Sequence, residues 1–147
     1  MNSPETVPGA ARVLVVDDEP DLRTLYELTL LREGHHVDAA GSLAEARERL
    51  ASGAFDVVIT DMRLPDGLGL ELLRDLATTQ RKERCIMITA YGSAENAVEA
   101  LKCGAFDYLT KPVDLKQFRG VVSSALQSPA APLQAAPTAA PAHPAAA

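Results

Sequence analysis

Five short apolar segments, each followed by a segment with helical spacing, are the feature that most restricts the fold of this chain. The apolar segments are rich in β-branched residues and lie at 13–16, 36–39, 57–59, 86–88 and 108–110. Because their apolar residues run almost continuously instead of alternating with polar ones, we expect strands that are covered on both faces. Such strands, alternating with helices, predict an α/β fold with a doubly wound parallel sheet, (βα)5. For five strands the common order is 2-1-3-4-5, the flavodoxin-like arrangement.

The segments between these strands carry signals for helix starts and ends. Pro20 occupies the place of a first helical residue, and Gly34 follows that helix. Ser42 and Glu45 form a capping box at the start of the second helix, and Gly53 ends it. The other three helices are predicted from apolar residues at helical spacing, with Ser93 opening the fourth and Asp114 capping the fifth. These residues are Leu68, Leu72, Leu73 and Leu76; Ala94, Ala97, Val98 and Leu101; and Phe118, Val121, Val122 and Ala125.

Composition separates one folded domain from the two ends of the chain. A chain of 147 residues has room for one domain with a substantial core. Residues 128–147 contain no charged residue and hold five of the ten prolines, so they predict a disordered Ala/Pro-rich linker or tail. We therefore expect a flexible N-terminal segment at 1–11, a domain at 12–127 and the linker or tail at 128–147.

Charge and hydropathy narrow the possible partners. The formal net charge is −6, and no basic stripe is present, so we expect no direct contact with nucleic acid by this segment. The longest apolar runs are far shorter than a membrane span, and the N-terminus lacks the features of a secretory signal. The two cysteines do not make a disulfide framework. These observations predict a cytoplasmic protein with no membrane contact.

Polar residues follow four of the five predicted strands. Asp17 and Asp18 follow the first strand, Asp61 the third, Thr89 the fourth and Lys111 the fifth. In open α/β sheets, ligands bind at the carboxyl ends of the strands, where the strand order reverses. Since adjacent strands lie about 4.8 Å apart, Asp18, Asp61 and Thr89 would share one rim. The long side chain of Lys111 can span the remaining gap, so all of these groups converge on one site.

This combination of groups suits phosphoryl transfer. Carboxylates this close together either raise the pKa of one of them strongly or require a counterion, and Lys111 offsets only one of their charges. The remaining charge suits Mg²⁺, a hard cation that prefers oxygen ligands. A carboxylate beside Mg²⁺ and an ammonium group can attack a phosphoryl group in line, while the Thr89 hydroxyl donates to a phosphoryl oxygen. The sequence therefore predicts that Asp61 is a phosphoacceptor.

Each feature also has a purely structural interpretation. The stretch Asp17-Asp18-Glu19-Pro20 could simply cap the first helix, because acids favour helix N-termini. A threonine at a strand end or a Lys-Pro pair in a loop is usually structural. Asp66 and Gly67 are interpreted as turn residues, and His35 and His36 as a solvated turn. The coincidence of suitable groups at four strand ends favours a functional site.

Three segments resemble the receiver domain of two-component response regulators, the CheY-like family. They read VLVVDDEPDLR, DVVITDMRLPDGLGLELL and MITAYGSAENAVEALKCGAFDYLTKPVDL, and the resemblance covers residues 12–127. MITAYGS, ALKCGAFDYLTKPVDL and TDMRLPDG are most similar to NtrC-type regulators of the PilR group, which controls type IV pilus genes. The resemblance implies roles for seven residues and a cis peptide before Pro112. The roles are phosphorylation for Asp61, Mg²⁺ binding for Asp17, Asp18, Asp61 and the backbone carbonyl of Arg63, switching for Thr89 and Tyr108, and phosphate pairing for Lys111.

The resemblance also implies partners. A sensor histidine kinase would phosphorylate the domain, which is a signalling phosphoacceptor and not an enzyme. The face formed by helix 4, strand 5 and helix 5 would then mediate homodimerisation or contact with a following domain. In NtrC-type regulators the output is transcription, through an AAA+ ATPase that acts on σ54 polymerase and a DNA-binding module, and neither module is present in these residues.

Three alternatives stay open. One is a stand-alone receiver that signals by protein binding. Another is a phosphatase that forms an aspartyl-phosphate, although such enzymes of the haloacid dehalogenase type carry D-x-D after strand 1, where this chain has D-D-E. The third is a flavin-binding domain, which would need a Ser/Thr/Gly-rich phosphate loop at that place.

Overall fold

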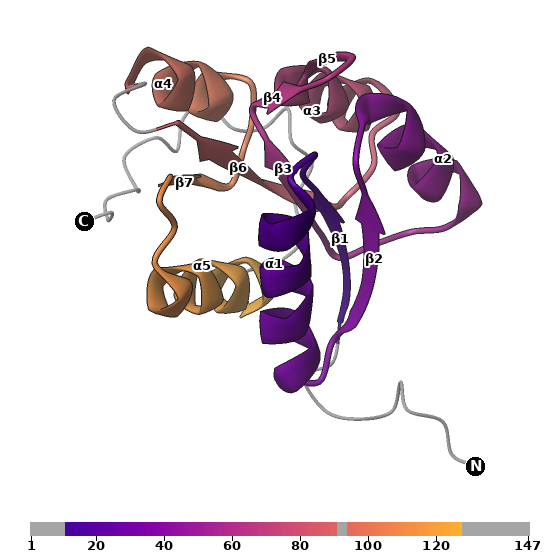
Figure 1. Ribbon diagram of the computed structural model, residues 1–147. Coiled ribbons are helices and arrows are strands. Elements are labelled where there is room, and N and C mark those ends of the chain that lie inside the picture. Colours follow the sequence, from indigo (N-terminus) through magenta and orange to yellow (C-terminus); the bar gives the residue numbers. More distant parts are fainter. Residues whose placement is uncertain (1–10, 91–93, 128–147) are drawn as a thin grey trace.

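The structure, a computed structural model, describes residues 11–90 and 94–127 (Figure 1). The main strands are β1 (Arg12–Val16), β2 (His36–Ala40), β3 (Val57–Asp61), β6 (Arg84–Thr89) and β7 (Asp107–Thr110). The helices are α1 (Pro20–Arg32), α2 (Leu43–Ser52), α3 (Gly69–Thr78), α4 (Ala94–Lys102) and α5 (Leu115–Gln127). A short hairpin consists of β4 (Arg63–Leu64) and β5 (Gly67–Leu68). The predicted tail at 128–147, Ser93 and the predicted N-terminal segment except Ala11 lie outside the described residues.

The five main strands form one parallel sheet. Their order is β2-β1-β3-β6-β7, which is the predicted order 2-1-3-4-5. The chain therefore reverses direction across the sheet between β1 and β3, the point at which ligands bind in folds of this kind. The carboxyl ends of all five strands lie at one edge, as the alternation of strands and helices requires.

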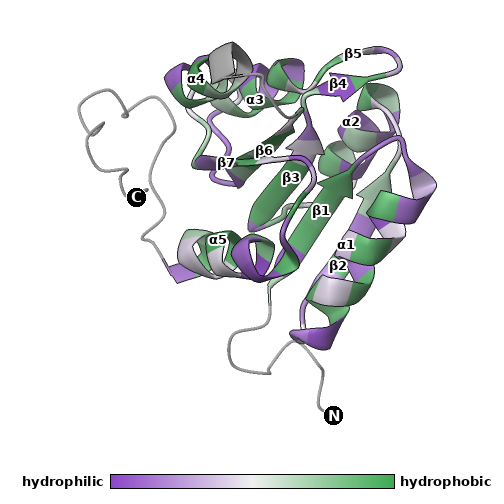
Figure 2. Cartoon of the chain, turned by 60° about the vertical axis from the view of Figure 1, so that its left-hand side comes forward, coloured by the Kyte–Doolittle hydropathy of each residue, from purple (hydrophilic) through white to green (hydrophobic). Residues whose placement is uncertain are grey.

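Helices cover both faces of the sheet (Figure 1). Val13 and Val15 of β1 face α1 and α5, whereas Leu14 and Val16 face the layer that contains α2, α3 and α4. Each of these four side chains is at most 1% exposed. Figure 2 shows the central strands as almost uniformly hydrophobic. Burial on both faces is thus the physical reason for the continuous apolar runs.

The helix starts follow the predicted signals with one difference. Pro20 is the first residue of α1, and Asp114 accepts a hydrogen bond from the Lys116 N–H at 2.9 Å. Ser42 Oγ accepts from the Glu45 N–H at 3.2 Å, but the Glu45 carboxylate accepts from the N–H of Gly41 and not from that of Ser42. Only half of the predicted capping box is therefore formed.

Some large apolar side chains remain exposed. Val98, one of the apolar residues whose spacing predicted the fourth helix, is 51% exposed, whereas Ala100 of the same helix is buried. On α1 the exposed large apolar residues are Leu25, Leu28 and Leu31, at 40%, 51% and 51%. Among the described residues, no helix combines the length and apolar character needed to cross a membrane.

Candidate functional site

Three carboxylates meet at the carboxyl edge of the sheet. Asp17 and Asp18 directly follow β1, and Asp61 is the last residue of the neighbouring strand β3. One carboxylate oxygen from each residue lies within 4.8 Å of the other two. Asp17 and Asp61 are buried, whereas Asp18 is exposed. The pairing of β1 with β3 therefore produces the acid cluster that the strand ends predicted.

Lys111 reaches this cluster from the end of β7. Its Nζ donates to Asp61 Oδ2 at 2.9 Å and to Glu19 Oε1 at 3.3 Å, and it lies 3.8 Å from Asp17 Oδ2. Burial by itself would lower the pKa of Lys111. The hydrogen bond to Asp61 and the negative charges of Asp61 and Asp17 outweigh burial and raise that pKa well above its ordinary value. Lys111 thus stays cationic and spans the two-strand gap, which confirms the predicted reach of its side chain.

Asp17 is the most enclosed acid of the cluster. Its Oδ1 accepts from the Glu19 N–H at 2.8 Å, whereas its Oδ2 is buried and has no hydrogen-bond partner in the described part of the chain. Burial raises the pKa of Asp17, and the Glu19 N–H and the charge of Lys111 act in the opposite direction. The N-cap of α1 is Glu19, without a side-chain capping bond, and Asp17 and Asp18 are the two residues before it, so the acids lie at the start of the helix as the structural interpretation expects. A buried carboxylate oxygen without a partner fits a bound cation.

Thr89 and Tyr108 lie on the strands beyond Asp61. Thr89 is 1% exposed, and its hydroxyl donates to the Leu109 carbonyl oxygen at 3.4 Å, toward β7. Tyr108 is 37% exposed on the outer strand. The backbone N–H of Lys111 donates to the Thr89 carbonyl oxygen at 2.8 Å, and the Lys111–Pro112 peptide is cis, as the resemblance implies. Thr89 is thus held at the same rim as the acids, with its hydroxyl bonded away from them.

Arg63 begins the short hairpin that follows the acceptor strand. The backbone between Asp61 and this hairpin is held on both sides, because the Met62 N–H donates to the Ile88 carbonyl oxygen at 2.8 Å and the Gly69 N–H donates to the Met62 carbonyl oxygen at 2.7 Å. The Arg63 side chain is exposed. A role for Arg63 through its backbone, and not through its guanidinium group, is compatible with this placement.

Two contacts at the site were not predicted from the sequence. Arg23 of α1 donates from Nη1 to the Asp17 carbonyl oxygen at 2.7 Å. Glu19 shares Lys111 with the acid cluster. Arg23 lies only six residues after Asp17, at the start of the next helix. This short separation is the sequence feature from which the contact could have been predicted. Both contacts tighten the turn that carries the acid pair.

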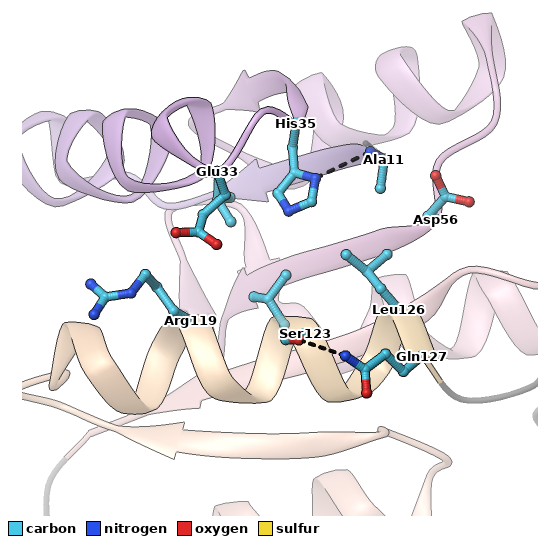
Figure 3. A pocket seen from close by; sticks show the side chains of 10 residues that line it. Ala11, Glu33, His35, Asp56, Arg119, Ser123, Leu126 and Gln127 are labelled. Carbon is cyan, nitrogen blue, oxygen red and sulfur yellow. Dashed lines mark hydrogen bonds between the residues drawn. The ribbon is translucent and has the colours of Figure 1, made fainter. Parts of the chain in front are cut away.

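A separate cavity of about 460 Å³ lies at the opposite edge of the sheet (Figure 3). Ala11 and Asp56 line it just before β1 and β3, and residues of α5 close another side. His35 points into this cavity, and its Nδ1 accepts from the Ala11 N–H at 3.1 Å. Burial lowers the pKa of His35. His36 is exposed as expected but begins β2 and does not lie in a turn, and His35 is half-buried, so the interpretation of the two as a solvated turn is wrong. This cavity is not the acid site.

Comparison with known proteins agrees with the site. The family model "Response regulator receiver domain" matches residues 13–123. The response regulator protein PilR of Pseudomonas aeruginosa is 51% identical over 116 residues, which are 79% of this chain and 26% of PilR. The DNA-binding transcriptional regulator NtrC of Azospirillum brasilense is 38% identical over 120 residues, which are 82% of this chain and 25% of that protein. The chain therefore spans about a quarter of the length of these curated relatives.

Solved structures show the same fold. The solution structure of the beryllofluoride-activated NtrC4 receiver domain dimer has a TM-score of 0.73 and 35% sequence identity, and the match covers 78% of this chain and 95% of that one. The Francisella response regulator 1452 receiver domain has a TM-score of 0.74 and 28% identity, with 79% of this chain and 96% of that one covered. The chain therefore belongs to the response regulator receiver domain family, as a receiver of the NtrC and PilR type, which is a signalling phosphoacceptor and not an enzyme.

Proposed function

We propose that this domain accepts a phosphoryl group from a sensor histidine kinase on Asp61 and uses it to switch its α4–β7–α5 face. The observation that carries the proposal is the arrangement around Asp61. This carboxylate lies beside two further acids and 2.9 Å from the cationic Nζ of Lys111. Asp61 is also the end of a fully buried strand, so its position is rigid.

In the transfer step an Asp61 carboxylate oxygen attacks the phosphorus atom. The new bond is the P–O bond of an acyl phosphate, and the bond that breaks is the P–N bond to the kinase histidine. The electron pair of that bond stays on the imidazole nitrogen of the kinase. Lys111 pairs with a phosphoryl oxygen, and the Thr89 hydroxyl donates to another after turning away from the Leu109 carbonyl.

Asp17, Asp18, Asp61 and the backbone carbonyl of Arg63 would hold Mg²⁺. Their oxygen atoms match the preference of this ion, and the unpartnered Oδ2 of Asp17 offers one ligand. When bound, Mg²⁺ would neutralise charge on the phosphoryl oxygens. Asp17 also fixes the turn before α1 through Glu19, so the acid pair is oriented before any ligand arrives.

The switch would pass from Thr89 to Tyr108. Movement of the Thr89 hydroxyl toward the phosphoryl group vacates space beside β7, and Tyr108 can turn inward to fill it. This would change the α4–β7–α5 face, on which Val98 and Tyr108 are exposed at 51% and 37%. We propose that this face forms a phosphorylation-dependent homodimer. The solved NtrC4 receiver described as a dimer in its beryllofluoride-activated form is a relative that supports this proposal.

The kinase would approach the edge of the sheet that carries Asp61. Helix α1 begins at this edge and exposes Leu25, Leu28 and Leu31 at helical spacing. An apolar helix face next to the acceptor suits contact with helices of a kinase. We propose that the domain lies in the cytoplasm. Its output would be transcription, as the name of the relative NtrC, a DNA-binding transcriptional regulator, indicates for that protein.

Phosphorylation by a small phosphodonor tests the acceptor. The protein is incubated with acetyl phosphate and Mg²⁺, and its intact mass is measured. We expect one phosphoryl adduct that is absent from the Asp61→Asn variant and from a sample with excess chelator. Thr89→Ala keeps the acceptor and should still form the adduct, but more slowly, because it lacks the hydroxyl that donates to a phosphoryl oxygen. Absence of an adduct on the unmodified protein would refute the proposal.

A further inference from the structure

Asp66 joins the hairpin after the acceptor strand to the start of α2. Its Oδ1 accepts from the Leu43 N–H at 2.8 Å, and its Oδ2 accepts from the Ala44 N–H at 3.0 Å. Leu43 and Ala44 are the first two residues of α2, whose N–H groups have no partner within the helix. The backbone bond to Leu43 and then that to Ala44 lower the pKa of Asp66, so its carboxylate is charged at neutral pH. The contact joins segments that lie 22 and 23 residues apart.

Apart from Asp66, the hairpin is held at its base, where Met62 is bonded to β6 and to Gly69 and the Leu68 N–H donates to Glu71 Oε2 at 3.3 Å. The strands of the hairpin have two residues each and pair only with one another, and so short a hairpin is marginal by itself. Leu64 is buried in the core layer that also contains Leu43. A Cβ atom on Gly67 would lie 2.5 Å from Leu43 Cδ1, so this glycine lets the hairpin lie directly against α2. The tip of the hairpin is therefore bonded to α2 through Asp66, whereas its base is bonded to β6 and α3.

The other end of the same hairpin is Arg63, two residues after Asp61. The last bond to the main sheet is that of the Met62 N–H to the Ile88 carbonyl oxygen, so the sheet holds the residue before Arg63 but forms no bond with Arg63 itself. Mg²⁺ requires near-octahedral oxygen ligands at about 2.0–2.1 Å, so a small rotation of the hairpin would displace one ligand from its place. A group that holds the hairpin against a rigid helix would therefore preserve the geometry of the cation site.

We propose that Asp66 is a positioning residue for the cation site: it anchors the hairpin to α2 and thereby holds the Arg63 carbonyl in place before the cation binds. The inference rests on the proposed function, because it assumes that Arg63 contributes a carbonyl to that site. Asp66 itself does not touch the phosphoryl group or the cation. Its effect is on the affinity for Mg²⁺, and the rate of phosphoryl transfer at saturating Mg²⁺ does not depend on it.

A purely structural role for Asp66 makes a different prediction. If Asp66 only caps α2, its removal lowers the stability of the domain, and removal of any other cap of that helix has the same consequences. Ser42 is such a cap, since its Oγ accepts from the Glu45 N–H at 3.2 Å, and no described hydrogen bond joins its side chain to the hairpin. Ser42→Ala is therefore a matched control that weakens α2 and leaves the hairpin anchored.

The experiment compares the wild type with Asp66→Ala, Asp66→Asn and Ser42→Ala. The Mg²⁺ dissociation constant is measured by NMR titration of backbone amide shifts, and the phosphorylation rate with acetyl phosphate is measured at saturating Mg²⁺. We expect Asp66→Ala to raise the dissociation constant about tenfold, a typical effect of losing a group that orients a metal ligand. Asp66→Asn keeps one oxygen acceptor and should give an intermediate value. Ser42→Ala should stay within about twofold of the wild type, and all maximal rates should agree within about twofold.

The outcomes distinguish the positioning role of Asp66 from the existence of the cation site itself. An unchanged dissociation constant in Asp66→Ala would overturn the positioning role, as would an equal increase in Ser42→Ala. A lower maximal rate with unchanged affinity would also overturn it. Failure of the wild type to bind Mg²⁺ would refute the cation site of the proposed function itself. If Asp66→Ala does not fold, the comparison of Asp66→Asn with Ser42→Ala makes the same distinction.

Discussion

The hydroxyl group of Tyr26 is buried without a partner, which predicts that Tyr26→Phe stabilises the domain. Tyr26 is 1% exposed, and its ring stacks on that of Phe118 with a centroid distance of 5.0 Å. Its Oη has no hydrogen-bond partner among the described residues. A buried polar group without a partner costs about 1–3 kcal/mol, whereas loss of a satisfied hydroxyl costs about 1 kcal/mol. Since phenylalanine keeps the ring contact, we expect the free energy of unfolding at pH 7 to rise by about 1–2 kcal/mol.

The burial of Tyr26 also predicts how the stability difference between Tyr26→Phe and the wild type depends on pH. Burial, followed by the negative charge of Asp17, raises the pKa of Tyr26 from 10.0 to about 12. The folded state therefore holds the phenol proton more tightly than the unfolded state does. This contribution to stability is fully present below pH 10 and is lost as the pH rises toward 12. The loss amounts to about 1.4 kcal/mol by pH 11 and approaches about 3 kcal/mol above pH 12, and the phenylalanine variant does not suffer it.

Urea unfolding followed by far-UV circular dichroism measures both effects. The wild type and Tyr26→Phe are compared at pH 7, 9 and 11, so that all other ionisations cancel in the difference. At pH 7 the free energy of unfolding should be larger for Tyr26→Phe than for the wild type. This difference in free energy should grow by about 1.4 kcal/mol between pH 9 and 11. A wild type that is more stable by about 1 kcal/mol at pH 7 would mean that the hydroxyl is hydrogen-bonded. Parallel curves above pH 9 would refute the burial argument.

Three further changes test other contacts. In Gly69→Ala the new Cβ collides with the carbonyl oxygen of Asp61. This overpacking costs about 1–3 kcal/mol, whereas the higher helix propensity of alanine contributes at most about 1 kcal/mol, so urea unfolding should show a net loss of stability. Glu83→Gln removes a 3% exposed carboxylate that accepts from Arg81 at 2.6 Å and should cost about 2–4 kcal/mol at pH 7. Burial opposes charging of Glu83, but hydrogen bonds from Arg81 and a backbone N–H outweigh burial and lower its pKa. The stability lost in Glu83→Gln should therefore shrink as the pH falls below 4.5, where the wild type loses the charged carboxylate as well. Leu28→Glu should slow phosphotransfer from the kinase at least about tenfold and leave the rate with acetyl phosphate unchanged, whereas equal slowing of both would exclude α1 as the kinase contact.

Most of the architecture follows from local patterns in the sequence. The apolar runs correspond to the five strands of the sheet, and Pro20, Ser42, Gly53 and Asp114 mark helix ends where they were predicted. These signals are reliable because they depend on the conformational preferences of neighbouring residues and on burial of both faces of the sheet. The strand order followed from the usual arrangement of five such units and not from any single residue.

The side-chain placements that the sequence did not predict depend on distant neighbours. Val98 has the spacing of a core residue, but α4 turns this side chain outward and buries Ala100. Leu68 has helical spacing too, yet it is the residue before α3 and is 43% exposed. Asp66 looked like a simple turn residue, because its partner helix lies more than twenty residues earlier in the chain. Helical periodicity predicts that a helix is amphipathic, but its rotation on the sheet is decided by packing.

The sequence by itself determined the set of chemical groups at this site: carboxylates after strands 1 and 3, a hydroxyl after strand 4 and a lysine after strand 5. Their types and order are local properties of the chain. Only the tertiary structure decided the geometry, in which three carboxylates lie within 4.8 Å of one another and Lys111 contacts Asp61 at 2.9 Å. It also decided that one oxygen of Asp17 is buried without a hydrogen bond, 3.8 Å from Lys111 Nζ, and that Asp66 caps a distant helix. These distances depend on strand pairing and side-chain packing between segments far apart in the chain, which no local pattern encodes.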